Sequence, residues 1–78
     1  MRVQNIERES QVRQARIRAD GEIERLRQEH RSRIISNTYT MTSAELAGLE
    51  RILDMELQQF KSRKDMEILQ LKTRLGVP

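Results

Sequence analysis

Apolar residues in the second half of the chain recur with a period of 11 residues. Three triplets follow one another at this spacing: Leu46, Leu49 and Leu53; Leu57, Phe60 and Lys64; and Ile68, Leu71 and Leu75. Eleven residues make three turns at about 3.67 residues per turn, so these positions stay on one face of a nearly straight helix. Only Lys64 interrupts this apolar stripe. The pattern predicts a long amphipathic helix over residues 43–75.

The first half of the chain carries a matching stripe with the same period. Its members are Val12, Ala15, Ala19, Ile23, Leu26, His30 and Ile34. The stripe predicts a helix over about residues 5–35, with Asn5 as its N-terminal cap. Asp20-Gly21 is the weak point, because Gly costs about 1 kcal/mol relative to Ala in a helix interior. Since the spacing continues unchanged through Gly21, we expect one continuous helix.

Residues 36–42 are polar and aperiodic and predict the connecting loop. Thr42 and Glu45 are spaced as a capping box for the second helix. Gly76 can take the left-handed conformation that closes a helix. A loop this short makes the two helices antiparallel. The fold class is therefore all-α, a single helical hairpin over residues 1–78.

Folding the two stripes onto each other predicts which residues face one another across the seam between the helices. Phe60, the largest side chain of the second stripe, is expected opposite Ala19, as close packing requires. Lys64 is expected opposite Ala15, where its methylene groups have room to turn outward. The remaining layers run from Ile34 with Leu46 to Val12 with Ile68.

A single seam is a marginal core for a chain of 78 residues, because conformational entropy opposes folding by about 1–2 kcal/mol per residue. Further apolar residues lie beside the stripes, and Met55 and Met66 are again 11 residues apart. We therefore expect two hairpins to associate into a four-helix bundle or coiled coil. The residues predicted to mediate self-association are Leu46, Leu49, Leu53, Leu57, Phe60, Ile68, Leu71, Ile23, Leu26, Met55 and Met66.

The charged residues favour a second type of partner. The chain holds 15 basic and 12 acidic residues, a net charge of +3. The predicted hairpin brings three arginines of the first helix beside three basic residues of the second. This basic belt could bind the phosphate backbone of duplex RNA or DNA, or it could be a solvated, ion-paired helix surface. The belt consists of Arg13, Arg16, Arg18, Lys61, Arg63 and Lys64.

Three single residues are further candidates. Tyr39, in the predicted loop, could dock a partner or could be a half-buried connector residue. His30 is more typical of a partly buried seam residue than of a metal ligand or a pH switch. Lys64 could select the alignment of the helices or could simply extend outward to water.

Catalysis has little support in these residues. There is no Cys and only one His, and the chain contains no Gly-rich phosphate loop and no HExxH pattern. We therefore expect no enzyme activity, no metal and no cofactor. The absence of a long apolar run and of a secretory pattern predicts an intracellular protein that neither enters a membrane nor is secreted.

The leading functional hypothesis is a non-enzymatic helical-hairpin assembly protein. It would act as a homo-oligomer, or as a small subunit or adaptor of a larger complex, viral or phage complexes included. The alternative is a dimeric binder of double-stranded RNA or DNA, such as a small regulator or silencing suppressor. A third hypothesis, adsorption of the Arg-rich first helix to an anionic membrane, is disfavoured by the six acidic residues among residues 1–36.

Overall fold

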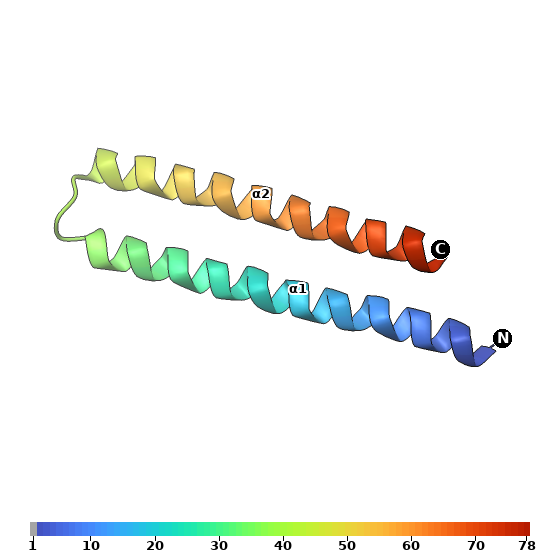
Figure 1. The fold of residues 1–78 in the computed structure, drawn as a ribbon. Helices are drawn as coiled ribbons and strands as arrows, with labels where there is room; N and C mark the ends of the chain where they lie inside the picture. The colour runs from blue at the N-terminus through green and yellow to red at the C-terminus, as the bar shows by residue number, and fades with distance from the viewer. Residues whose placement is uncertain (1) are drawn as a thin grey trace.

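The computed structural model consists of two long α-helices that lie side by side and run antiparallel (Figure 1). It describes residues 2–78, with side chains from residue 5 onward. Helix α1 spans Arg2–Asn37 and helix α2 spans Ser43–Leu75. The molecule measures 60 × 16 × 10 Å, with both termini at the end away from the connection. The predicted all-helical hairpin is confirmed.

Helix α1 is one continuous helix of 36 residues, so it does not break at Gly21. Its start differs from the prediction, because the helix begins at Arg2 and Asn5 lies inside it. Asn5 therefore does not cap α1, and this prediction is wrong. A capping residue favours a helix start at its position but does not prevent the preceding residues from being helical.

Helix α1 also continues two residues further than predicted, to Asn37. The side chains of Ser36 and Asn37 donate hydrogen bonds to the carbonyl oxygen of Arg33, at 3.1 and 2.8 Å. The Thr38 hydroxyl donates to the carbonyl oxygen of Ile34 at 3.0 Å. These polar side chains satisfy carbonyl groups that the end of a helix leaves without partners. The connection is therefore residues 38–42 rather than 36–42.

Helix α2 has the bounds that the sequence pattern predicts, and both of its ends are capped as expected. The Glu45 amide donates to the Thr42 hydroxyl at 3.2 Å, and the Thr42 amide donates to the Glu45 carboxylate at 3.4 Å. At the other end Gly76 has φ 71° and ψ 27°, the left-handed conformation. The Val77 amide then donates to the carbonyl oxygen of Lys72 at 2.9 Å, which completes the cap.

The core is the single seam between the helices. Its buried apolar residues all belong to the two stripes, and Leu53, at 3% exposure, is the most enclosed of them. Other stripe members are only half-buried, because one helix can cover little more than one side of another. The buried apolar residues are Val12, Ala19, Ile23, Leu53, Leu57 and Ile68.

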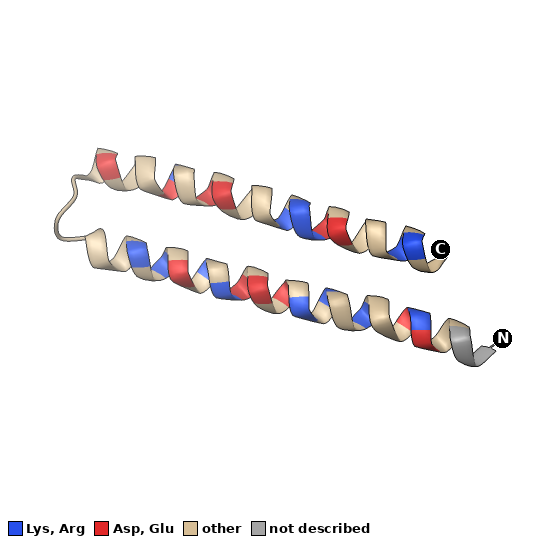
Figure 2. Ribbon diagram, viewed as in Figure 1, with Lys and Arg blue, Asp and Glu red and all other residues tan. Residues whose placement is uncertain are grey.

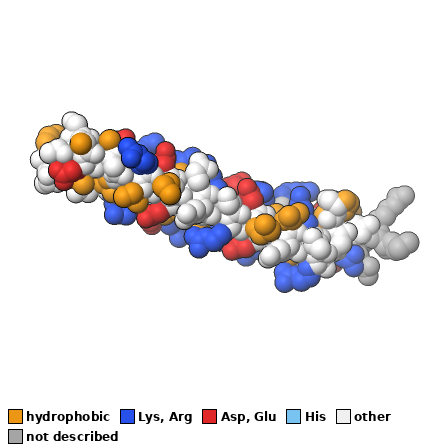
Figure 3. Space-filling view, turned by 90° about the horizontal axis from the view of Figure 1, so that it is seen from above, with side chains coloured by type: hydrophobic (Ala, Val, Ile, Leu, Met, Phe, Trp, Pro, Cys, Tyr) orange, Lys and Arg blue, Asp and Glu red, His pale blue; other side chains and the backbone are white. Residues whose placement is uncertain are grey.

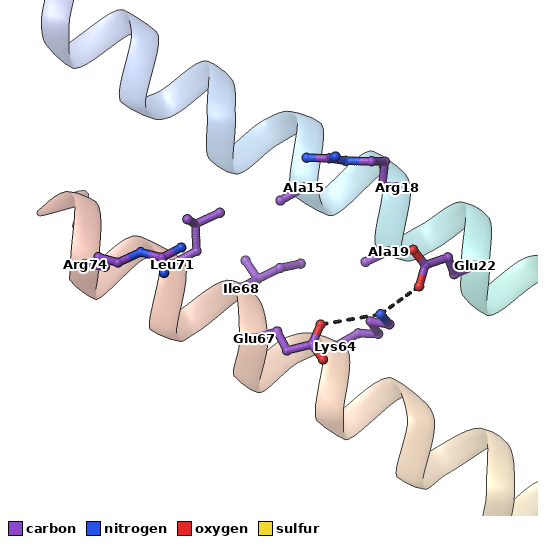
Figure 4. A pocket seen from close by; sticks show the side chains of 9 residues that line it. All are labelled: Ala15, Arg18, Ala19, Glu22, Lys64, Glu67, Ile68, Leu71 and Arg74. Atoms are coloured by element: carbon purple, nitrogen blue, oxygen red, sulfur yellow. Dashed lines mark hydrogen bonds and ion pairs between the residues drawn. The ribbon is translucent and has the colours of Figure 1, made fainter.

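The alignment of the helices differs from the prediction by about one helical turn. Lys64 lies beside Ala19 and Glu22 rather than opposite Ala15, and Ile68 lies between Ala15 and Ala19 (Figure 4). Phe60 does not face Ala19: it lines a hollow together with Leu26 and Glu22. The predicted layer pairs are therefore wrong. A repeated stripe can slide by one layer and still present an apolar residue to each apolar neighbour, so periodicity alone does not determine the alignment.

Candidate functional site

The six residues of the basic belt do not form one surface. Arg16 and Lys61 lie on one side of the seam, in a hollow that also contains Asp20 and Asp65. Arg18 and Lys64 line a different hollow, of about 280 Å³, with Glu22 and Glu67 (Figure 4). Arg63 lines a third hollow, which also includes Glu22. The hairpin thus separates the belt into groups, each with its own acidic residues.

Two members of the belt are engaged in ion pairs. A guanidinium nitrogen of Arg16 lies 2.9 Å from a carboxylate oxygen of Asp65 on the other helix. The ammonium of Lys64 lies 2.7 Å from Glu22 on the other helix and 3.4 Å from Glu67 on its own helix. These carboxylates offset the positive charge that a phosphate backbone would require.

The Lys64–Glu22 pair changes the acidity of both groups. The hydrogen bond from Lys64, followed by its positive charge, lowers the pKa of the Glu22 carboxyl. The hydrogen bond to Glu22 raises the pKa of the Lys64 ammonium against the opposing effect of burial. Both groups are therefore held in their charged forms at neutral pH.

Basic side chains also contact the single ring of the seam. The Lys64 ammonium lies 5.2 Å from the centre of the Phe60 ring, and the Arg63 guanidinium lies 5.7 Å from it. Both distances fall in the range of cation–π attraction. Phe60 therefore helps to hold two members of the belt against the surface of the hairpin.

Positive and negative side chains alternate along both helices instead of segregating (Figure 2). The hollow in Figure 4 has an apolar floor of Ile68 and Leu71 and a rim of charged residues. Its lining contains no Ser, Thr, His or Cys that could act as a nucleophile or as an imidazole base. Among the described residues, no group of three His, Cys, Asp or Glu side chains is placed to hold a metal ion.

His30 and Tyr39 have opposite environments. His30 is buried in the seam, and its Nε2 atom lies 3.5 Å from a carboxylate oxygen of Glu56. Tyr39 lies in the connection and is 97% exposed, so its ring is not half-buried in the connection. The phenol ring is therefore accessible to a partner at the loop end of the rod.

The residues predicted to mediate self-association have different degrees of burial. Most of them are buried or half-buried within the hairpin itself, where they form the seam. Only Met55 and Met66 have more than half of their surface accessible, at 58% and 55%. The seam residues thus stabilise the hairpin, and the two methionines are the members of the set that remain available to a partner.

Charged rows border the α2 stripe on both sides, a feature that the sequence analysis missed. Glu45, Glu56 and Glu67 follow one another 11 residues apart along one side, and Glu50, Lys61 and Lys72 do so along the other. Glu56 and Glu67 lie next to the seam, since they contact His30 and Lys64. The period that revealed the apolar stripe would also have revealed these rows.

Comparisons with family models, with curated proteins and with solved structures found no match to this chain. Neither described helix contains a segment long and apolar enough to cross a membrane.

Proposed function

We propose that this protein is a non-enzymatic helical-hairpin interaction protein, which acts as a homo-oligomer or as a small subunit or adaptor of a larger complex. The observation that supports it is the distribution of large apolar side chains over the described residues. More of them are exposed to solvent than are buried in the seam. The exposed ones are Ile6, Ile17, Ile35, Tyr39, Ile52, Met55, Met66 and Leu69.

The energetic argument follows from the single seam. Burial of a Leu-class or Met side chain is worth roughly 1.5–3 kcal/mol relative to exposure. A hairpin with six buried apolar residues has used only part of the burial that its sequence offers. Association that covers Met55, Met66, Ile52 or Leu69 would supply the rest, and exposed apolar residues on one side of a helix are typical of interaction surfaces.

Sedimentation equilibrium over a wide range of protein concentration tests this proposal. We expect the mass to rise above the 9.3 kDa of one chain as concentration increases. A mass of one chain at every concentration would contradict self-association. The adaptor form of the proposal would then require a complex with another helical protein.

A second proposal is duplex nucleic-acid binding through the basic belt. The observation that favours it is that Arg13, Arg18 and Arg63 form no ion pair with any residue that the structure describes. The pairing of Arg16 and Lys64 with acidic residues makes this proposal the weaker one.

The same sedimentation experiment, repeated with a 20-base-pair duplex at low and physiological salt, tests the second proposal. Binding through the belt should fall steeply as salt rises. The Arg16→Glu/Lys64→Glu double variant should abolish binding while the circular dichroism spectrum remains helical. Equal binding by the wild type and this variant would contradict the proposal.

A further inference from the structure

The side of α2 that points away from α1 carries an extended surface without charge. Helical periodicity places Met55, Gln59, Ser62, Met66, Leu69 and Thr73 on this outward face. The structure confirms that these residues are exposed. Figure 3 views this side of the molecule and shows apolar and uncharged side chains along the middle, with charged side chains mainly along the two edges.

This composition is unusual for a helix face that contacts only water. Charged residues occur throughout α2, yet none lies on the outward face between residues 52 and 73. The corresponding outward face of α1 is interrupted by Arg13, Glu24 and Arg25. Solvent-exposed helix faces are normally rich in charged residues, so the outward face of α2 resembles a contact surface.

The charged rows beside the seam restrict how two hairpins could pack. In a four-helix bundle, the second hairpin would cover one side of the seam and bury either Glu45, Glu56 and Glu67 or the row of Glu50, Lys61 and Lys72. Removing such a row of charges from water is costly unless each charge finds a new partner. The outward face of α2 can be covered without burying either row.

The edges of the outward face determine the direction of a second copy. Arg63 lies along one edge, and Asp54 and Asp65 lie along the other. When two identical helices pack in parallel, opposite edges meet, so Arg63 of each copy adjoins Asp65 of the other. When they pack antiparallel, like edges meet, and carboxylates would adjoin carboxylates. Charge complementarity therefore favours the parallel arrangement.

We propose that two copies of this chain dimerise through the outward faces of their α2 helices, with the helices parallel and in register. This inference rests on the proposed function and specifies its partner and its surface. Met55 then packs on Met55 of the second copy, Met66 on Met66, and the small Ser62 allows close approach between these two layers. Arg51, nearer the connection, extends its guanidinium to water at the edge.

Single-cysteine variants of the full chain test this arrangement, because the natural sequence contains no Cys. Met55→Cys and Met66→Cys should each form a disulfide-linked homodimer under mild oxidation, since paired Cα atoms must lie within about 7 Å. Ile17→Cys, on the outward face of α1 and 64% exposed, is the matched control. We expect cross-linking of the two α2 variants to be at least about tenfold faster than that of the control.

Each alternative outcome overturns a specific part of the inference. Cross-linking only in a mixture of Met55→Cys with Met66→Cys would mean that the helices are antiparallel. Equally fast cross-linking of Ile17→Cys would mean that the outward face of α2 is not the selective contact. A wild-type dimer without cross-linking at either α2 position would refute this surface and leave the proposed self-association intact. A wild-type chain that is monomeric at all concentrations would refute both.

Discussion

The ammonium of Lys64 lies 2.7 Å from a carboxylate oxygen of Glu22, so the one polar residue of the α2 stripe is paired across the seam. The Lys64 side chain is only 19% exposed, and Glu67 provides a second carboxylate at 3.4 Å. Apolar layers that repeat every 11 residues tolerate several alignments of the helices. A pair between one lysine and one carboxylate on opposite helices favours one of them.

Reversal of the charge at this position should destabilise the hairpin. Lys64→Glu would place a third carboxylate beside Glu22 and Glu67, and we expect the free energy of unfolding to fall by roughly 1–2 kcal/mol. Adding Glu22→Lys should recover part of that loss, because it restores an attractive pair. Urea unfolding followed by circular dichroism measures both variants. A double variant no more stable than Lys64→Glu would show that the pair does not stabilise this alignment.

The same pair predicts two pH limits. The lowered pKa of Glu22 means that its contribution to stability is present above about pH 4.3, the usual Glu value, and is lost as pH falls through the lowered pKa. The raised pKa of Lys64 means that its contribution is present below about pH 10.4 and is lost as pH rises through the raised pKa. Thermal melts across pH should show both losses. In Glu22→Gln the acid limb should become shallower, and an unchanged acid limb would exclude Glu22 as its source.

Leu53 is the most enclosed residue of the seam, at 3% exposure. We expect Leu53→Ala to lower the free energy of unfolding by about 2–5 kcal/mol, enough to unfold much of so thin a structure. Leu69→Ala is the matched control, because Leu69 is on the same helix and 57% exposed. At low protein concentration the control should change stability by less than about 0.5 kcal/mol. Equal losses for the two variants would contradict the observed seam.

Two glycines should respond to alanine with opposite signs. Gly21 lies inside α1, and a Cβ atom there would have nothing within 4 Å. Gly21→Ala should therefore raise stability by about 0.5–1 kcal/mol. Gly76 has φ +71°, so Gly76→Ala should lower stability through backbone strain. Thermal unfolding of both variants at one protein concentration checks the prediction, and a lower melting temperature for Gly21→Ala would contradict it.

The double variant Met55→Lys/Met66→Lys should be a helical monomer. Both side chains are exposed in the hairpin, so the substitutions remove no seam contact, whereas four ammonium groups would adjoin in the proposed dimer. Sedimentation equilibrium measures the mass, and circular dichroism verifies the helix content. Ile17→Lys is the control and should associate like the wild type. A double variant that still associates would exclude these methionines from the contact.

Features that depend on neighbouring residues could be predicted from the sequence. The capping box of Thr42 and Glu45 and the left-handed Gly76 involve contacts within about one turn, so the sequence itself contains their geometry. The continuity of α1 through Gly21 followed from an unbroken period. Asn5 was a weaker case, because a single capping residue does not determine where a helix begins.

Long-range features were harder to predict. The alignment at Lys64 depends on the path of residues 38–42 and on pairing with Glu22, and a repeated stripe gives no information about either. The grouping of the basic belt followed the same limitation, because a list of basic residues does not show that Arg16 contacts Asp65. The charged row through Glu56, in contrast, was visible in the sequence.

The exposed ring of Tyr39 and the two chain termini lie at opposite ends of a rod about 60 Å long. Continuous helices of this kind are stiff, because every backbone hydrogen bond along them must be kept. A molecule bound at Tyr39 would therefore be held at a fixed distance from anything joined to either terminus. The hairpin is in this respect a molecular spacer, with a length set by the number of its 11-residue repeats.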